Sequence, residues 1–222
     1  MPALRAVLFD LDGTLLDTAP DMVGALNKLL AEQQRSPLPY EEVRYLVSHG
    51  SSRLVKLGFP EAEPEVFASL QKRYLEIYAG ALSLETRLFE GMDGVLEAIE
   101  GRGLRSGIVT NKPGWLTQPL LEQLGLTSRF ACVVSGDTVS ARKPDPMPML
   151  HAAGLAGVPA KACLYVGDAE RDVQAAHAAG MPALVATYGY LQPDEDWQAW
   201  GGDGSIAQPI DLLPWLEHSG RA

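Results

Sequence analysis

Residues 6–14 read Ala-Val-Leu-Phe-Asp-Leu-Asp-Gly-Thr, an apolar run that ends in two aspartates one residue apart. The apolar part is typical of a buried strand. Since side chains alternate along a strand, Asp10 and Asp12 should point toward the same place at its carboxyl end. Two carboxylates at one place repel each other and are costly to desolvate. A cation or a reaction that uses both acids would explain this cost, and an acidic turn after a strand is the simpler alternative.

Four further apolar runs share the character of the first and indicate a parallel sheet that is buried on both faces. Apolar residues at helical spacing separate most of these runs, as in Val95, Leu96 and Ile99. Such alternation of strands and helices predicts an α/β protein with a doubly wound, Rossmann-like parallel sheet. The predicted strands are Ala6–Phe9, Ser106–Val109, Ala131–Val134, Cys163–Val166 and Ala183–Ala186, and the predicted helices include 147–153 and 169–179.

The long segment between Asp12 and Gly91 contains no strand-like run and shows helical spacing instead. Its apolar faces could pack together as a small bundle. Because the segment follows the two acids directly, it could close over them as a lid, although a structural appendage is the alternative. Helices are expected around residues 22–30, 41–47, 52–57 and 66–78.

We therefore expect two domains. Residues 1–16 and 89–222 form the Rossmann-like core, and residues 17–88 form an inserted α-helical cap. The tail from Tyr188 to Gln208 lacks clear periodicity and is expected to be a loop.

Composition restricts the class of protein. The 222 residues are 46% hydrophobic, which is enough for a sizeable core. A net charge of −10 argues against nucleic acid and anionic membrane surfaces as main partners, whereas a local cation would still allow a small anionic substrate. Cys132 and Cys163 lie in apolar runs and are expected to be reduced thiols. With no signal-peptide pattern and no run long enough to span a membrane, we expect a cytoplasmic protein of undetermined oligomeric state.

Polar side chains follow four of the predicted strands. Ligands of open α/β sheets bind at the carboxyl ends of the strands, so these side chains should meet there. Each has a simpler explanation alone: Thr110 could cap the next helix, Lys143 could be solvated, and Asp172 could be a surface acid after a cap at Asp168. Together they place acids, a hydroxyl group and a cation at one edge. The residues are Asp10, Asp12, Thr110, Asn111, Lys143, Asp168 and Asp172.

Phosphoryl transfer through a carboxylate is the chemistry that needs this set. Asp10 and Asp168, with a backbone carbonyl, offer the hard oxygen ligands that Mg²⁺ prefers. One aspartate of the first pair could attack phosphorus while the other donates and accepts the proton. Thr110 and Lys143 could bind the phosphate oxygens on which charge spreads in the transition state.

These residues also resemble the four motifs of the haloacid dehalogenase superfamily, phosphatase branch. The motifs are Asp10-Leu11-Asp12-Gly13-Thr14, Thr110-Asn111, Lys143, and Gly167-Asp168 with Asp172. The resemblance implies that Asp10 is the nucleophile and Asp12 the general acid/base. It also implies that Asp10, the carbonyl of Asp12, and Asp168 hold Mg²⁺, with Asp172 supporting the metal. In the same way it implies that Thr110, Asn111 and Lys143 bind phosphate and that residues 17–88 are the family's helical cap.

Other activities within and outside this superfamily fit less well. The dehalogenase branch lacks an acid at the position of Asp12. A phosphonate-hydrolysing branch uses a cap lysine, but Lys56 lies on an amphipathic pattern and is more simply solvated. A mutase related to β-phosphoglucomutase shares the core and the cap type and stays an alternative. A non-catalytic phospho-ligand sensor has no missing catalytic position to support it, and a dinucleotide-binding domain would need a Gly-x-Gly-x-x-Gly pattern after the first strand.

The substrate is expected to carry a phosphate and a carboxylate. The chain resembles bacterial phosphoglycolate phosphatases and their relatives that act on N-acetylmuramic acid 6-phosphate. Residues 188–195, Trp200-Gly201 and 47–50 favour the second group, which implies a role in recycling cell-wall sugars. A carboxylate substrate suggests a cation in the cap, for which Arg44, His49 and Arg53 are candidates, although either arginine could be solvated.

Overall fold

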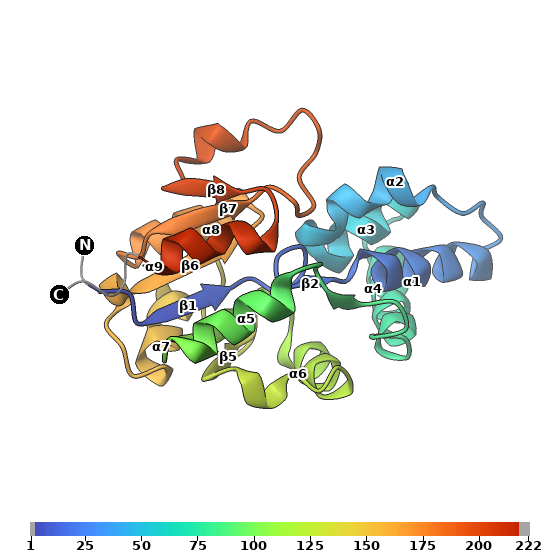
Figure 1. Ribbon diagram of the computed structural model, residues 1–222. Coiled ribbons are helices and arrows are strands. Elements are labelled where there is room, and N and C mark those ends of the chain that lie inside the picture. Colours follow the sequence, from blue (N-terminus) through green and yellow to red (C-terminus); the bar gives the residue numbers. More distant parts are fainter. Residues whose placement is uncertain (1–2, 218–222) are drawn as a thin grey trace.

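The computed structural model describes residues 3–217 and shows an α/β core beside a block of helices (Figure 1). All neighbouring strands of the six-stranded core sheet are parallel, in the order β5-β4-β1-β6-β7-β8. The chain winds from β1 toward one edge and then returns to build the other, which confirms the doubly wound α/β fold. The strands are β1 (Ala6–Phe9), β4 (Arg105–Val109), β5 (Cys132–Val134), β6 (Cys163–Gly167), β7 (Ala183–Ala186) and β8 (Gly204–Ile206).

The register of the sheet brings the ends of β1, β4 and β6 together. Phe9 is paired with Ile108 on one side and with Val166 on the other. The residues that directly follow these positions therefore leave the sheet at one place. This is the point at which the chain reverses its winding direction, where ligands of doubly wound folds bind.

Alternate side chains of β1 enter two different apolar clusters. Val7 and Phe9 pack with residues of α5, α6 and α9, whereas Ala6 and Leu8 pack with residues of α7 and α8. Both faces of the sheet are thereby covered, as continuous apolar strands require. The helices are α5 (Met92–Gly101), α6 (Gly114–Gln123), α7 (Met147–Leu155), α8 (Glu170–Ala178) and α9 (Leu213–Glu217), with 3₁₀ helices η2 (Thr127–Arg129), η3 (Ala160–Ala162) and η5 (Pro209–Leu212).

The segment 188–208 is not entirely loop, so the expectation for this tail was wrong. It contains a 3₁₀ helix, η4 (Trp197–Trp200), and the edge strand β8. The strand is only Gly-Ser-Ile, a pattern too short and too poor in apolar residues to be recognised. Pairing with β7 gives it strand structure.

The helical block follows β1 and consists of four α-helices and one 3₁₀ helix. Its longest helices, α1 and α4, pack against each other, and α3 packs against both. These elements are α1 (Ala19–Glu32), α2 (Tyr40–Val43), η1 (Arg44–His49), α3 (Gly50–Gly58) and α4 (Pro64–Ala79).

Two short strands join the block to the core, so the expectation of no strand between Asp12 and Gly91 was wrong. They are β2 (Leu16–Asp17) and β3 (Arg87–Leu88), which pair antiparallel. Two-residue strands carry no periodicity. Asp21 strengthens this junction because its Oδ2 accepts hydrogen bonds from the backbone N–H and the hydroxyl group of Thr86, at 2.9 and 2.7 Å.

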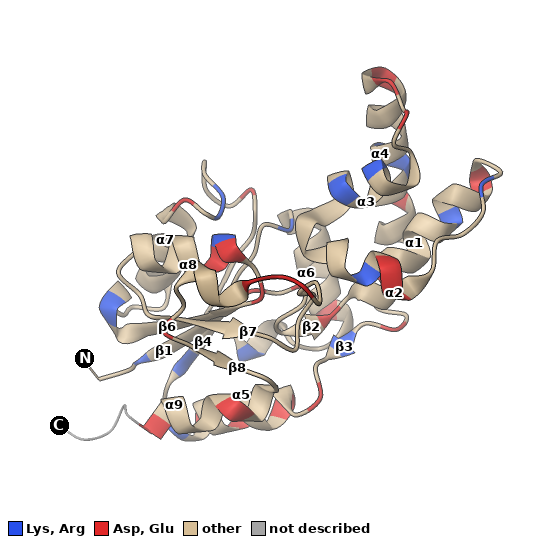
Figure 2. Ribbon diagram, turned by 90° about the horizontal axis from the view of Figure 1, so that it is seen from above, with Lys and Arg blue, Asp and Glu red and all other residues tan. Residues whose placement is uncertain are grey.

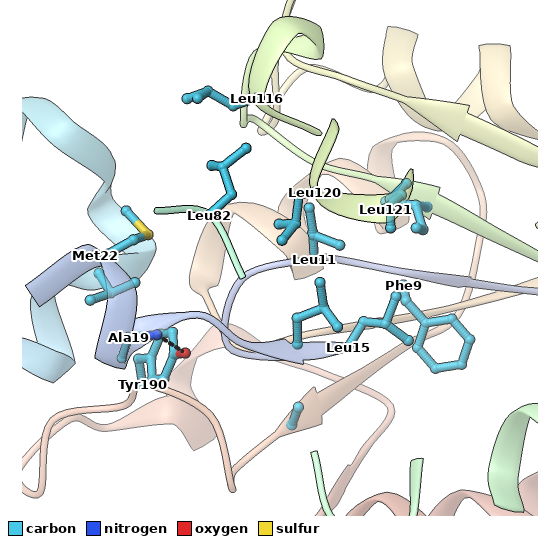
Figure 3. Close-up of a cluster of buried hydrophobic side chains, with 14 of the residues drawn as sticks. Phe9, Leu11, Leu15, Ala19, Met22, Leu82, Leu116, Leu120, Leu121 and Tyr190 are labelled. Atoms are coloured by element: carbon cyan, nitrogen blue, oxygen red, sulfur yellow. Dashed lines mark hydrogen bonds between the residues drawn. The ribbon is translucent and has the colours of Figure 1, made fainter. Parts of the chain in front are cut away.

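A single apolar cluster runs from the sheet into the base of the block (Figure 3). Leu11 and Leu15 lie beside Leu120 of α6, and Leu82 and Met22 extend the cluster toward the helices. Core and block therefore share buried apolar surface at their junction.

Charged residues are found on both parts of the chain, with acidic residues on α2 and α5 (Figure 2). No helix within residues 3–217 is long and apolar enough to span a lipid bilayer.

Candidate active site

Asp10 leaves β1 at the centre of the sheet edge. Its backbone N–H donates to the carbonyl of Val166 at 2.9 Å and extends the β1–β6 pairing by one residue. The turn that follows depends on Gly13, whose φ is +86° and where a Cβ would overlap Oδ2 of Asp168. The glycine thus allows Asp168, which follows β6, to lie directly against the turn that follows Asp12.

Three buried carboxylates converge at this point. Oxygens of Asp10, Asp168 and Asp172 lie within 4.8 Å of one another. Burial, together with the neighbouring charges of Asp10 and Asp172, raises the pKa of Asp168 to about 7. Oδ1 of Asp168 is buried and accepts no hydrogen bond from any described residue. An unsatisfied carboxylate oxygen beside two other carboxylates is a donor set that suits a hard divalent cation.

Lys143 lies beneath these carboxylates and neutralises part of their charge. Its side chain is 0% exposed, and its Nζ lies 2.8 Å from Oδ1 of Asp10 and 2.7 Å from Oδ1 of Asp172. Nζ also donates to the carbonyl of Val109 and the hydroxyl group of Tyr165, at 2.8 and 2.9 Å. The alternatives of a solvated Lys143 and a surface-exposed Asp172 are therefore both wrong.

Asn111 fixes the position of the Lys143 loop. Its side-chain amide donates to the carbonyl of Lys143 and accepts from the backbone N–H of Lys143, both at 3.0 Å. Thr110, which precedes it, does not cap α6, because the residue at that cap is Pro113. Thr110 and Asn111 both line the pocket described below.

Four residues that were not among the predicted site residues connect this edge to the helical block. From the core, Lys112 donates to Oδ1 of Asp12 at 2.9 Å and to the hydroxyl group of Tyr78 in α4 at 2.8 Å. From the block, the hydroxyl group of Ser48 donates to Oδ2 of Asp168, while Arg171 donates to the carbonyl of Ser48, both at 2.7 Å. The sequence signal for the two core residues was proximity, because Lys112 follows Thr110-Asn111 and Arg171 precedes Asp172. Ser48 lies in the segment 47–50 that the resemblance had pointed to.

The core edge and the block enclose a pocket of about 510 Å³. Asp10, Asp12 and Thr110 lie on its core side. The block contributes apolar and polar side chains to the pocket lining, which we call the apolar wall and the polar wall. The apolar wall contains Met22, Val47, Tyr74, Leu75 and Tyr78, and the polar wall contains Ser48, His49, Ser51, Ser52 and Gln71.

The three candidate cations of the block lie in different environments. His49 lines the pocket, and burial together with the charge of Arg171 lowers its pKa. Arg44 instead lies over the rings of Tyr45 and Tyr190, 5.0 and 5.8 Å from their centroids. Arg53 is exposed on α3, and neither arginine is among the described residues that line the pocket.

Comparisons with known proteins agree with this geometry. Residues 7–186 match the family model of haloacid dehalogenase-like hydrolases. A phosphoglycolate phosphatase of Xylella fastidiosa is 43% identical over 205 residues, which are 92% of this chain and 90% of that protein. An N-acetylmuramic acid 6-phosphate phosphatase of Pseudomonas putida is 37% identical over 210 residues, 94% of each protein.

A solved structure shows the same arrangement. It is described as a predicted phosphoglycolate phosphatase from Haemophilus somnus, and it superposes with a TM-score of 0.86 at 28% identity, covering 97% of this chain and 99% of that one. Together with the family model and the relatives, this structure confirms the resemblance predicted from the four motifs. The chain belongs to the haloacid dehalogenase-like hydrolases and is a phosphoric monoester hydrolase.

Proposed function

We propose that this protein is a Mg²⁺-dependent phosphatase that hydrolyses N-acetylmuramic acid 6-phosphate through an aspartyl-phosphate intermediate. The observation that carries the phosphatase mechanism is the group of three buried carboxylates beside Lys143, of which Asp10 lines the pocket together with Asp12 and Thr110. Phosphoglycolate is the second candidate substrate, supported by the 43% identity to phosphoglycolate phosphatases.

The donor set fits the metal that the family implies. Asp10, Asp168 and the backbone carbonyl of Asp12 would hold Mg²⁺, and Asp172 would support it from beside Lys143. When bound, the metal neutralises phosphate charge so that a negatively charged nucleophile can approach phosphorus. The raised pKa of Asp168 fits a group whose ionised form needs a cation as partner.

The chain's own residues would carry the chemical steps. A carboxylate oxygen of Asp10 attacks phosphorus, and the bond between phosphorus and the leaving oxygen breaks. Asp12 gives its proton to the leaving oxygen and then removes a proton from the water that hydrolyses the aspartyl phosphate. Thr110 and Lys143 hold the phosphate oxygens on which negative charge spreads.

The pocket supports a sugar-sized substrate. A volume of about 510 Å³ is in the range for small organic ligands and leaves much space around the two-carbon phosphoglycolate. An apolar wall that includes Tyr74 and Tyr78 suits a sugar ring, and Ser51 and Gln71 on the polar wall suit hydroxyl and acetamido groups. Residues 17–88 would then act as the cap domain of a core formed by residues 1–16 and 89–222.

The substrate carboxylate would meet cations of the core. Arg142 and Arg171 line the pocket, and neither forms an ion pair with a described residue. His49, with its lowered pKa, is better suited to donate or accept a hydrogen bond in its neutral form.

Phosphate release from N-acetylmuramic acid 6-phosphate and from 2-phosphoglycolate tests this proposal. We expect kcat/KM for the sugar acid to be at least 100-fold higher, and activity to be lost with EDTA and in Asp10→Asn. Glu97→Gln, an exposed substitution of the same kind on α5, serves as the control. Activity that survives both EDTA and Asp10→Asn would exclude the mechanism, and a 100-fold preference for phosphoglycolate would assign the second substrate.

A further inference from the structure

Lys112 has a buried ammonium group to which the mechanism above gives no part. The lysine follows β4 and Thr110-Asn111, and its side chain is 5% exposed. Its Nζ lies 2.9 Å from Oδ1 of Asp12, and it donates to the hydroxyl group of Tyr78 at 2.8 Å while lying 4.6 Å from the centroid of the Tyr78 ring. Burying an ammonium group is costly unless it is paired, so this position calls for an explanation.

The contacts of Asp12 are unevenly distributed between its two oxygens. Oδ1 accepts hydrogen bonds from Lys112 and from the hydroxyl group of Thr18, at 2.9 and 2.7 Å. Oδ2 accepts none from any described residue, although Asp12 lines the pocket. Two donors on one oxygen fix the rotation of the carboxylate and leave the other oxygen available to the substrate.

Tyr78 belongs to the helical block, so the lysine joins the two parts of the protein. Tyr78 is buried, its ring stacks against that of Tyr74, and both residues line the pocket. If the block were displaced from the core, Lys112 would lose one of its two partners. The orientation of Asp12 therefore depends on contact between Tyr78 and the core.

We propose that Lys112 is a positioning residue that orients Asp12 toward the leaving oxygen, and that Tyr78 holds Lys112 for this task when the block rests on the core. This inference deepens the proposed function and depends on the role that it gives to Asp12. Lys112 itself neither bonds to phosphorus nor transfers the proton.

The leaving group distinguishes this role from a structural one. In the first half of the reaction Asp10 forms a bond to phosphorus, the ester P–O bond breaks, and the leaving oxygen takes the proton of Asp12. An alkoxide leaves poorly without that proton, whereas p-nitrophenolate is stable as an anion. Since kcat/KM reports the steps up to departure of the leaving group, a misoriented Asp12 should slow alkyl esters and spare p-nitrophenyl phosphate.

The test compares Lys112→Met and Tyr78→Phe with the native enzyme on N-acetylmuramic acid 6-phosphate, 2-phosphoglycolate and p-nitrophenyl phosphate. For the better alkyl ester we expect kcat/KM to fall about 100-fold in Lys112→Met and about 10-fold in Tyr78→Phe, within the usual contribution of general acid catalysis. For p-nitrophenyl phosphate it should fall less than about threefold. Lys72→Met, an exposed substitution on α4, should change neither value.

Equal losses on alkyl and aryl esters would overturn the proposal, because they would show a structural role or a contact with phosphate. Unchanged alkyl activity in both variants would also overturn it. Tyr78→Phe keeps the ring and decides the question alone if Lys112→Met does not fold. The proposed function is tested separately, since Asp10→Asn must abolish turnover of all three esters whatever Lys112 does.

Discussion

The sheet edge and the helical block contribute different kinds of groups to the same pocket. On the sheet edge, Asp10 lines the pocket and is paired with the buried Lys143, which is 0% exposed and lies 2.7 Å from Asp172, itself 1% exposed. The polar wall of the block contains serines, a glutamine and a histidine with a lowered pKa. Buried charges that depend on a few fixed partners tolerate little change, whereas neutral groups on a partly open wall can be exchanged at small cost. We infer that the core sets the chemistry and binds the charged groups of the substrate, and that the neutral wall of the block selects the rest of the substrate.

Substitution of Lys143 is expected to have the largest effect on stability and activity, because it tests whether the buried charges of the core depend on one another. Lys143→Met removes the cation that Asp10 and Asp172 share and leaves these carboxylates without their buried partner. Loss of one member of a buried ion pair costs about 3–5 kcal/mol, so we expect the free energy of unfolding in urea to fall by this amount. Activity should fall by at least about 1,000-fold.

The exposed Lys161 provides the control for this substitution, because Lys161→Met removes a solvated charge. Its free energy of unfolding should change by less than about 0.5 kcal/mol. If the two variants were equally stable, the buried carboxylates would not need Lys143 for stability. The core would then tolerate substitution as well as the block does, contrary to our inference.

The raised pKa of Asp168 predicts how pH changes the stabilisation of the protein by Mg²⁺. Its pKa in the folded, metal-free protein is about 7, above the ordinary value of 3.8. For an acid with a raised pKa, the contribution to stability is present at low pH and is lost as pH rises through 7. Mg²⁺ binds the ionised group, so the rise in Tm caused by Mg²⁺ should be larger at pH 8 than at pH 5. Below pH 7 the apparent affinity should fall about tenfold per pH unit.

Thermal unfolding with and without Mg²⁺ at the two pH values measures this effect. Asp168→Asn should abolish most of the rise in Tm at both pH values, because an amide is neither charged nor titratable. The exposed Asp194→Asn should behave as the native protein does. An equal rise in Tm at pH 5 and pH 8 in the native protein would contradict the assignment of Asp168 as a metal ligand.

The sequence could predict the parts of the site that depend on local pattern. Asp10 and Asp168 directly follow apolar strands, and the carboxyl ends of parallel strands meet by necessity, so their proximity could be predicted from the strand pattern. Asp12 lies beyond the end of β1, and its carboxylate is not one of the three clustered acids. Lys112 could not be assigned in this way, because its partners Asp12 and Tyr78 are 100 and 34 positions away in the chain.

The missed elements of the fold have the same physical origin. Strand β8 and the pair β2–β3 are stabilised by their neighbours, and two or three residues carry no recognisable alternation. Which cation of the block reaches the pocket also depends on tertiary structure. Arg44 and Arg53 fit the charge of the substrate, but nothing in the local pattern tells which face of a helix will meet the pocket. Whether these two arginines bind substrate stays a prediction, which substitution of Arg53 tests for one of them.

Arg171→Met and Arg53→Met test whether the core or the block recognises the substrate carboxylate. Arg171 lines the pocket and donates to the carbonyl of Ser48, whereas Arg53 is exposed on α3. Loss of a charge-assisted contact costs about 1.5–3 kcal/mol, so KM for the carboxylated substrate should rise about 10- to 100-fold in Arg171→Met. It should change less than about twofold in Arg53→Met.

p-Nitrophenyl phosphate is the internal control for this pair of variants, because it has no carboxylate. Its KM should stay within about threefold of the native value in both variants. A larger rise in KM for the carboxylated substrate in Arg53→Met than in Arg171→Met would place the carboxylate near the block and reverse our assignment.

Ser48 gives the smallest expected effect and tests the direct link between the two regions. Its hydroxyl group is the only described side chain of the block that bonds to one of the three clustered carboxylates, at 2.7 Å from Oδ2 of Asp168. In Ser48→Ala that oxygen keeps the backbone N–H of Tyr190 at 3.0 Å, so only one bond is lost. A loss of about 1 kcal/mol predicts a decrease of about fivefold in kcat/KM.

The exposed Ser69→Ala on α4 removes a hydroxyl group without touching the site and should leave kcat/KM unchanged. The Mg²⁺ affinity of Ser48→Ala, measured by calorimetry, should weaken by a similar factor, because the ionised form of Asp168 loses one of its donors. If kcat/KM fell while Mg²⁺ affinity stayed constant, Ser48 would act on the substrate alone, and the block would influence binding without influencing the carboxylates. If both fell together, this one hydroxyl group of the block would also influence the carboxylates that perform the chemistry in the core.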